Sequence, residues 1–223
     1  MPLTAPPTVN ILAALPTKRM AGLRLHRVYL ASRPSPWFFA SLPPQADPYA
    51  HGRFDLPHPD GACYISTSAV AAVLETFQHL VGGLIPDQEL RVRARAEVVA
   101  PTTCPPAANL TAARARGAGV TAALWADHDR VRTQAWADQL RRAGHRALFH
   151  GIGHDPTVRL RGLTLFDKAG EHPPYDDAAG WRATRHAVHN DSQLRATLGR
   201  YGLTVTRSDP SLPLIRLDDS GLL

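Results

Sequence analysis

Cysteine is scarce in this chain, with only Cys63 and Cys104 among 223 residues. A small secreted fold held together by disulfides needs several cysteine pairs, so a disulfide framework is excluded and both thiols are expected to be free. The chain also lacks a Cys-x-x-Cys motif, and its eleven histidines do not follow a metal-ligand spacing. We therefore expect no bound metal.

Long hydrophobic runs are missing as well. No stretch reaches the roughly 18 consecutive apolar residues that a membrane-spanning helix needs, so no membrane association is expected. The segment 1–23 contains four prolines and lacks a positively charged start, which predicts an irregular N-terminal arm and not a signal peptide. With 44% hydrophobic residues, the chain has enough apolar surface for a core and is expected to be soluble and cytoplasmic.

A glycine-rich phosphate loop is absent too, because Gly151-x-Gly153 lacks a third glycine and a following amphipathic helix, which argues against a Rossmann domain. The net charge of +6 raises the alternative of nucleic-acid binding. Arginines alternate with apolar residues over 90–98, which predicts a strand with one buried face and one solvated basic face. No aromatic residues interleave for base stacking, so direct nucleic-acid binding is not expected. The basic face suits an acidic partner segment or an anionic substrate equally well.

The most informative region runs from Gly52 to Glu75. A loop containing Arg53 leads to a strand predicted over 62–66, and this strand leads to a helix predicted over 67–77. The apolar residues of the helix recur at helical spacing, which turns one stripe inward and leaves Glu75 beside it. A loop, a strand and a helix thus bring polar groups together within 24 residues.

The expected side-chain geometry in this region favours one shared functional site over three residues with unrelated structural roles. Taken singly, Arg53 is typical of a surface charge, Tyr64 of a half-buried strand residue and Glu75 of a solvated helix flank. The strand period of two puts Tyr64 and Ser66 on one face, and Glu75 is stacked over two alanines that allow close approach. Eleven residues separate Arg53 from Tyr64, and eleven more separate Tyr64 from Glu75. This ordered spacing predicts a shared crevice.

The pattern resembles the RES domain, a bacterial family named after signature arginine, glutamate and serine residues. Its members are often the toxin of a toxin–antitoxin pair with an Xre-type DNA-binding antitoxin. The matching segments are Leu-His-Arg-Val-Tyr with the signature Arg27, Gly-Arg-Phe-Asp with Arg53, Tyr64 and the signature Glu75. Thr-Gln-Ala-Trp-Ala at 133–137 and Gly-Leu-Thr-Leu-Phe at 162–166 are similar to elements that flank the family's last catalytic segment. The resemblance spans roughly residues 24–167.

One departure from the family concerns the signature serine. Where the family has a tyrosine, one residue and then the serine, this chain reads Phe-His-Gly-Ile-Gly-His-Asp over 149–155. Gly151 therefore occupies the position of the serine. His150 or His154 is expected to supply a hydrogen-bonding group nearby.

The resemblance implies an α+β fold like that of ADP-ribosyltransferases, with mixed and antiparallel strands and flanking helices. It also implies cleavage of NAD, as substrate, at the bond between nicotinamide and ribose. Glu75 would stabilise the positive charge that develops on the ribose, and the guanidinium groups of Arg27 and Arg53 would bind the pyrophosphate or an attacking phosphate. These three residues are the expected catalytic groups. The expected NAD-binding residues are Arg27, Arg53, Tyr64, Ser66, His150 and Gly151.

The function implied by the resemblance is that of an NAD phosphorylase or NAD glycohydrolase acting as the toxin of a type II toxin–antitoxin pair. Two alternatives remain open: an ADP-ribosyltransferase that modifies a macromolecule, and a catalytically inactive RES-like binding module. The expected partners are NAD, phosphate as one of the acceptors, and an Xre-type antitoxin. The sequence leaves the acceptor and the formation of a homodimer undecided.

The rest of the chain is expected to organise around this core. We predict an arm over 1–23, a RES domain over 24–167 and a C-terminal extension over 168–223 packed on the core. A helix is predicted from Asp127 or Asp129 to about Ala143, with Val131, Ala135 and Leu140 inward. The other predicted elements are a strand over 160–166, a helix from 190 or 191 to 201 and a strand over 203–207. Short strands without regular βαβ alternation favour an α+β class over a doubly wound sheet.

Overall fold

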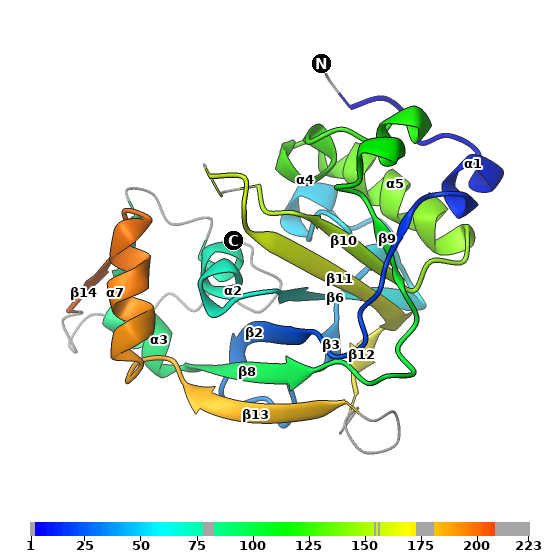
Figure 1. Cartoon of the computed structure of the whole chain (residues 1–223). Helices are drawn as coiled ribbons and strands as arrows, with labels where there is room; N and C mark the ends of the chain where they lie inside the picture. The colour runs from blue at the N-terminus through cyan, green and yellow to red at the C-terminus, as the bar shows by residue number, and fades with distance from the viewer. Residues whose placement is uncertain (1–2, 78–82, 154, 156, 173–180, 208–223) are drawn as a thin grey trace.

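A mixed sheet is the centre of the molecule in the computed structural model, which describes residues 3–77, 83–153, 155, 157–172 and 181–207 (Figure 1). Its strands in spatial order are β1 (Thr17–Lys18), β9 (Ala107–Asn109), β10 (Ala147–Gly151), β11 (Arg161–Lys168), β6 (Asp60–Ser66), β2 (Arg24–Leu30), β8 (Arg93–Val99) and β13 (Arg182–Ala187). Neighbouring strands are antiparallel except β9 and β10, which are parallel. The sheet therefore has the mixed, largely antiparallel order predicted from the sequence.

Three two-stranded pairs flank the main sheet. They are β3 (Phe38–Phe39) with β12 (Gly170–Glu171), β4 (Ser41–Leu42) with β5 (Leu56–Pro57), and β7 (Leu84–Pro86) with β14 (Thr204–Thr206). The last pair joins β7 to β14, which lies near the C-terminal end of the described residues. The predicted strand over 203–207 is thus confirmed.

Helices cover part of one sheet face. They are α1 (Val9–Ala13), α2 (Ala69–Thr76), α3 (Asp87–Arg91), α4 (Ala123–Ala126), α5 (Arg130–Arg142) and α7 (Ser192–Arg200), with 3-10 turns η1 (Pro48–Ala50) and η3 (Ala113–Ala118). Ser68, Asp129 and Asp191 cap α2, α5 and α7 through side-chain oxygens, as the N-cap preference predicts. Within the described residues, no helix is long and apolar enough to cross a membrane.

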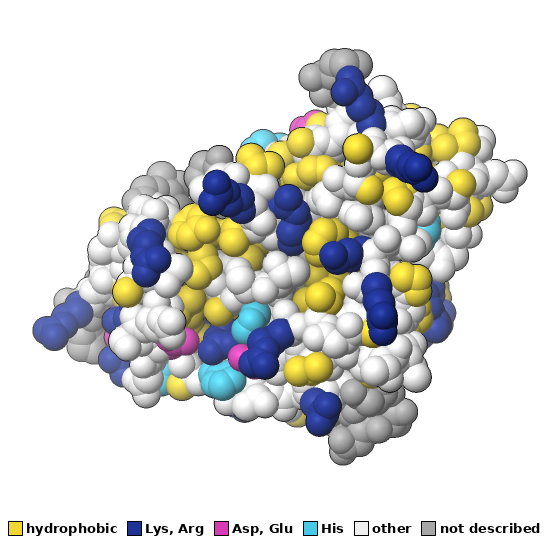
Figure 2. Space-filling view, viewed as in Figure 1, with side chains coloured by type: hydrophobic (Ala, Val, Ile, Leu, Met, Phe, Trp, Pro, Cys, Tyr) yellow, Lys and Arg dark blue, Asp and Glu magenta, His cyan; other side chains and the backbone are white. Residues whose placement is uncertain are grey.

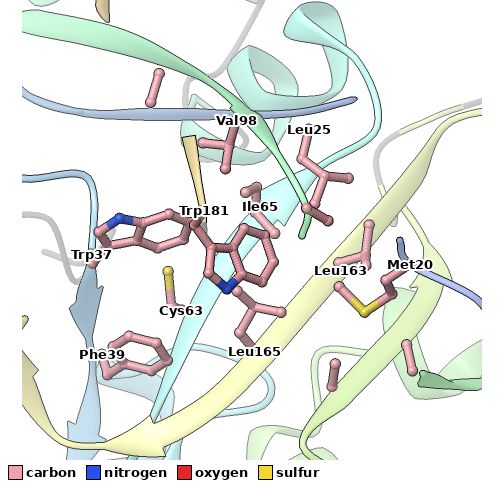
Figure 3. Packing of buried hydrophobic residues seen from close by; sticks show 14 of the residues in the cluster. Met20, Leu25, Trp37, Phe39, Cys63, Ile65, Val98, Leu163, Leu165 and Trp181 are labelled. Atoms are coloured by element: carbon pink, nitrogen blue, oxygen red, sulfur yellow. The ribbon is translucent and has the colours of Figure 1, made fainter. Parts of the chain in front are cut away.

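One face of the sheet is covered by a first hydrophobic cluster (Figure 3). Strand alternation supplies it with Leu25 from β2, Cys63 and Ile65 from β6, and Leu163 and Leu165 from β11. Tryptophans from outside the sheet close over these residues. The rings of Trp37 and Trp181 meet edge to face, with their centroids 5.4 Å apart.

The opposite face carries two separate groups of helices (Figure 1). A second cluster packs α1, α4 and α5 against β9 and β10, and a third cluster packs α2, α3 and α7 against β2. Leu148 and Trp136 belong to the second cluster, whereas Val28 and Val73 belong to the third. The central strands β11 and β6 run between the two groups, and this arrangement positions the site described below.

The N-terminal segment differs from the irregular arm that its prolines predicted. It forms α1 and β1, and it buries Leu3, Leu12 and Leu15 in the second cluster. Met20 enters the first cluster. Outside 9–13 and 17–18 the described part of the segment has no helix or strand, and the burial of Leu12 and Leu15 stabilises a helix that is too short to be stable by itself.

The arginines of the segment 90–98 also differ from the solvated basic face that was predicted for them. Arg91 ends α3, and Arg93 and Arg95 on β8 are buried, so this face is not a solvated basic surface. Glu89 lies 3.3 Å from Arg93, and Asp191 lies 3.4 Å from Arg95. Helices α3 and α7 thus cover the face and supply the counter-charges.

The predicted helix starting at Asp127 or Asp129 is confirmed as α5, but its inward face is shifted. Val131 and Ala135 are exposed, whereas Trp136 and Leu140 are buried. The predicted extension over 168–223 lies partly outside the described residues. Within the described part, β13 joins the edge of the main sheet and α7 packs into the third cluster.

Candidate active site

A rigid loop over residues 52–55 forms one wall of the site. The carboxylate of the buried Asp55 accepts hydrogen bonds from the backbone N–H of Gly52 at 2.8 Å and from the Tyr64 hydroxyl at 2.7 Å. The same hydroxyl accepts from the N–H of Phe54 at 2.8 Å. A side chain on Gly52 would collide with the Tyr64 ring, because its Cβ would lie 2.8 Å from Cζ. The Tyr64 hydroxyl is therefore committed to holding the loop.

Burial sets the ionisation of these groups. It raises the pKa of Asp55, and the hydrogen bonds from Tyr64 and Gly52 only partly offset this effect. Burial and the neighbouring Asp55 hold the pKa of Tyr64 well above its usual range, so the phenol stays protonated and keeps donating. The loop thus has a stable hydrogen-bond pattern at neutral pH.

Helix α5 and the segment before it hold this loop from the other side. The side-chain amide of Gln134 donates to the carbonyl oxygens of Pro48 at 3.0 Å and Gly52 at 3.1 Å. Arg53 Nε donates to the carbonyl oxygen of Asp127 at 3.3 Å. These contacts join residues more than 70 positions apart and fix the direction of the Arg53 side chain.

Two arginines at this point have unused hydrogen-bond donors. A terminal nitrogen of Arg53 and one of Arg130 are buried without a hydrogen-bond partner, and neither guanidinium has an ion pair within the described part of the chain. Burial, together with the nearby charge of Arg130, lowers the pKa of Arg53 to about 10, and the charge of Glu75 opposes this shift. Buried, unsatisfied cationic donors are costly, so this pair is suited to an anionic ligand.

Glu75 on α2 supplies a negative charge to the same space. Burial raises the pKa of its carboxyl group, and the positive charges of Arg53 and Arg130 partly offset this effect. The carboxylate is half-buried and has no hydrogen bond or ion pair with any described residue. A carboxylate and two guanidinium groups therefore interact electrostatically without touching, which leaves their polar atoms available to a ligand.

His150 lies beneath this site as part of the sheet. Its Nδ1 donates to the Gly151 carbonyl at 2.8 Å, so its Nε2 accepts from the Thr164 hydroxyl at 3.0 Å. Burial lowers the pKa of the ring to about 4. The ring also packs against Phe54, with centroids 4.8 Å apart. Both ring nitrogens are thus used within the protein, and the ring supports the Arg53 loop from below.

Ser66 lies on the same sheet face as His150. It is paired with Gly162 of β11 and with His26 of β2, and it is buried at the end of β6 just before α2. A side chain on Gly162 would strike the His150 ring, with its Cβ 2.6 Å from Cε1. The absence of that side chain lets the imidazole lie over β11.

Gly151, at the end of β10, packs directly against α4. A Cβ at this position would lie 2.8 Å from Cε2 of the Trp125 indole. A Cβ on Gly153 would lie 2.6 Å from the Trp125 carbonyl oxygen. The indole therefore fills the space that a side chain of residue 151 would need. His154, named with His150 as a hydrogen-bonding group, lies outside the described residues.

Arg27 is not brought into this group. Alternation along β2 turns Arg27 toward the first cluster together with Leu25, and it turns Val28 toward α2 and the third cluster. The Arg27 guanidinium donates to the Phe38 carbonyl at 3.1 Å and contacts the sulfur of Cys63. The sheet thus separates Arg27 from Glu75, and Arg130 provides the second guanidinium beside Arg53 instead.

Arg130 and Trp125 are the site residues that the sequence analysis missed. Arg130 is the first residue of α5, where the helix dipole disfavours a cation and favours an acid. A basic residue at that position is a detectable signal. Trp125 stands in an alanine-rich segment with no pattern that assigns it a role, so only the packing of α4 against Gly151 reveals its position.

Comparisons with known proteins identify the family and the fold. The model of the RES domain family matches residues 24–152. No curated protein sequence matches the chain. The fold is similar to a chain in the crystal structure of the M. tuberculosis MbcT–MbcA toxin–antitoxin complex, with a TM-score of 0.56, 16% identity, and coverage of 84% of this chain and 96% of that chain. The predicted α+β fold of the RES type is confirmed.

Proposed function

The chain belongs to the RES domain family, and from this premise we propose that it consumes NAD by cleaving the bond between nicotinamide and ribose. The observation that carries the proposal is electrostatic: the carboxylate of Glu75, which has no hydrogen-bond or ion-pair partner among the described residues, interacts with Arg53 and Arg130, each of which has an unsatisfied guanidinium nitrogen. NAD presents an anionic pyrophosphate and a ribose that becomes cationic during cleavage. The two kinds of charge in the site complement the two parts of the substrate.

Glu75 is the proposed catalytic group. Nicotinamide leaves as a neutral molecule, so its departure needs no general acid, but positive charge develops on the ribose. A half-buried carboxylate with no competing partner stabilises that charge more strongly than a solvated one. Because the positive charge is largest in the transition state, this interaction lowers the barrier more than it tightens substrate binding.

Arg53 and Arg130 are the proposed anion-binding groups. Their planar guanidinium groups suit two oxygens of a phosphate, and the Arg53 side chain is already held by the Asp127 carbonyl. The bound anion would be the pyrophosphate of NAD or an inorganic phosphate that attacks the ribose. Ser66 lies on the sheet face that carries His150, and Gly151 follows His150 at the end of β10; both are included in the proposed NAD site, which Tyr64 and His150 support from within the protein.

We further propose that phosphate or water accepts the ADP-ribosyl group, which makes the enzyme an NAD phosphorylase or an NAD glycohydrolase. A macromolecular acceptor is the second candidate, as in an ADP-ribosyltransferase. A third candidate is an inactive binding module, because Gly151 occupies the position of the family's signature serine. Release of nicotinamide separates the third candidate from the first two.

A toxin–antitoxin role is the proposed biological context. The similar structure is that of a toxin–antitoxin complex, and the family resemblance implies an Xre-type antitoxin as the partner. NAD depletion in the cytoplasm would harm the cell that makes the enzyme, so a neutralising antitoxin is the expected partner. Co-expression with the product of an adjacent helix-turn-helix gene would test the pairing by restoring growth.

The deciding experiment incubates purified protein with NAD, with and without inorganic phosphate, and separates the products by chromatography. We expect nicotinamide in both cases if water is an acceptor, and only with phosphate if phosphate is required. Radiolabel on the ADP-ribose portion should remain on a small molecule. Label on protein or nucleic acid would favour the transferase, and the absence of nicotinamide would refute the proposed function.

A variant and a matched control test whether Glu75 takes part in catalysis. Glu75→Gln should lower kcat by about 100-fold or more, because it removes charge stabilisation made mainly in the transition state. Glu171→Gln is the control, since Glu171 pairs with Arg33 outside the proposed site. Circular dichroism should show that both variants are folded. Equal turnover in the two variants would remove Glu75 from the mechanism.

Arg130→Ala should lower kcat/KM for NAD by about 10- to 100-fold, because a charged hydrogen bond to the substrate is lost. Arg142→Ala on the same helix is the control, since Arg142 forms an exposed pair with Asp138 at 2.9 Å. Steady-state kinetics of nicotinamide release measures both. A wild-type kcat/KM in Arg130→Ala would contradict the assignment.

A further inference from the structure

The indole of Trp125 occupies a position that a residue-151 side chain would normally take. Gly151 ends β10, and the ring of Trp125 lies so close that a Cβ could not be accommodated, with Cε2 at 2.8 Å and Cδ1 at 2.9 Å from its ideal position. The indole Nε1 is the atom nearest to that position. A hydrogen-bond donor of the tryptophan therefore occupies space that any side chain at position 151 would need.

This donor is free. Nε1 of Trp125 forms no hydrogen bond with any of the described residues, and the side chain is half-buried. The indole of Trp136 shows the usual outcome instead, since its Nε1 donates to the Thr4 carbonyl at 2.8 Å. An indole N–H that is fixed by packing but has no partner is available to a ligand.

Shared neighbours connect this donor to the anion-binding groups. Trp125 packs against the second cluster, as does Tyr64, and that cluster contains Phe54, the neighbour of Arg53. Two residues after Trp125, the carbonyl of Asp127 accepts the hydrogen bond from Arg53. Gly151 itself follows His150, whose ring contacts Phe54. The indole thus belongs to the short segment, residues 125–127, to which the Arg53 guanidinium is hydrogen-bonded.

We propose that the indole N–H of Trp125 donates a hydrogen bond to an anionic phosphate oxygen of the bound substrate, in place of a side chain at position 151. The inference rests on the proposed function. An indole nitrogen donates but does not accept, so it selects an oxygen with lone pairs and cannot bind a substrate N–H. Trp125 is therefore a substrate-binding residue that acts together with Arg53, and Gly151 is the residue that makes room for it.

The first test removes the donor and keeps the ring. Trp125→Phe should raise the Kd of ADP-ribose, measured by isothermal titration calorimetry, by about tenfold or more, because a hydrogen bond to a charged oxygen is lost. Trp181→Phe, in the first cluster on the other face of the sheet, is the matched control and should keep the wild-type Kd. A wild-type Kd for Trp125→Phe in folded protein would overturn the inference.

The second test moves the hydrogen-bond donor from position 125 to position 151. Gly151→Ser alone should weaken ADP-ribose binding, because the new side chain displaces the indole. Trp125→Ala alone should weaken it by removing the donor. The double variant should bind at least several-fold more tightly than Trp125→Ala, since the serine hydroxyl then has room to donate in the vacated space. Additive losses in the double variant would overturn the inference.

A third measurement needs no substitution. The other three tryptophans, Trp37, Trp136 and Trp181, are buried, so acrylamide quenching of fluorescence reports mainly on Trp125. Saturating ADP-ribose should reduce the quenching constant, and unchanged quenching would count against the inference. Failure of these tests in an enzyme that still releases nicotinamide would refute only the role of Trp125. Absence of nicotinamide release in the wild type would refute the proposed function itself.

Discussion

Glu75 shows how a single residue is held in an unfavourable state. Burial disfavours its charge, and Arg53 and Arg130 recover only part of that loss, so the pKa of the carboxyl group is raised. A direct salt bridge would satisfy the carboxylate better but would also occupy the atoms that the proposed substrate needs. Proteins commonly accept reduced stability at a functional site for this reason.

His150 is the residue with the clearest effect of pH on stability. Its pKa is lowered to about 4 in the folded state from an ordinary value of 6.5. At a pH between about 4 and 6.5, His150 is therefore protonated in the unfolded chain but neutral in the folded chain. The free energy of unfolding falls as the pH drops through this range, because the unfolded state binds the additional proton. The loss should reach about 3 kcal/mol, by the relation between pKa shifts and free energy.

The measurement is urea unfolding of the wild type and His150→Gln at pH 7 and pH 5. We expect the variant to be less stable at pH 7, because the contacts with Gly151 and Thr164 are impaired, and less sensitive to acidification. His128→Gln, at an exposed position, is the control and should follow the wild type. Equal acid sensitivity of wild type and His150→Gln would contradict the argument.

At the scale of elements, the loop over 48–55 is held in place by its neighbours and not by its own secondary structure. Helix α5 contributes the Gln134 amide to two loop carbonyls, and strand β6 contributes the Tyr64 hydroxyl. A loop that carries a functional arginine needs such support, because a shift of about 1 Å at the reacting groups can reduce catalysis greatly. The loop, α5 and β6 therefore form one unit.

Replacement of Gln134 tests this unit. Gln134→Leu should destabilise the fold by about 1–3 kcal/mol, because two loop carbonyls lose their donor in a buried place. Amide hydrogen exchange over 48–55 should accelerate more than exchange in β8. The control is Gln193→Leu on the exposed side of α7. Unchanged protection of the loop in Gln134→Leu would show that α5 does not hold it.

At the scale of the whole molecule, the site exists because the helices form two groups on one sheet face. The second cluster and the third cluster leave β11 and β6 between them, and Arg53, Arg130 and Glu75 reach this space from different sides. Basic side chains are spread widely over the face in Figure 2, whereas acidic ones are few. With a net charge of +6, this field would favour the approach of an anionic substrate such as NAD.

The N-terminal segment completes the second cluster, and this can be tested by adjacent substitutions. Leu12 is fully buried, whereas its neighbour Ile11 is 48% exposed. Leu12→Ala should lower the free energy of unfolding by about 2–5 kcal/mol through the cavity that it leaves. Ile11→Ala should cost less than about 1 kcal/mol. Urea denaturation measures both, and similar losses in the two variants would contradict the packing described for α1.

The sequence by itself determined the elements whose signals are local. N-cap signals at 66–68, at Asp127 or Asp129, and at 190 or 191 mark helix starts to within one or two residues, and alternation marks β6. The spacing of Arg53, Tyr64 and Glu75 predicts a loop, a strand and a helix that meet. These features depend on hydrogen bonds and side-chain periods within a few residues, which a single chain reveals. The family resemblance followed from the same local motifs.

Only the tertiary structure decided which side chains share the site. The face of β2 that Arg27 occupies depends on its register with β6 and β8, and the inward face of α5 depends on where Trp136 packs. A shift of one position in a strand moves a side chain to the opposite face, so local periodicity cannot assign it without the partner strand. The same long-range packing brought Arg130 beside Arg53 and Trp125 against Gly151.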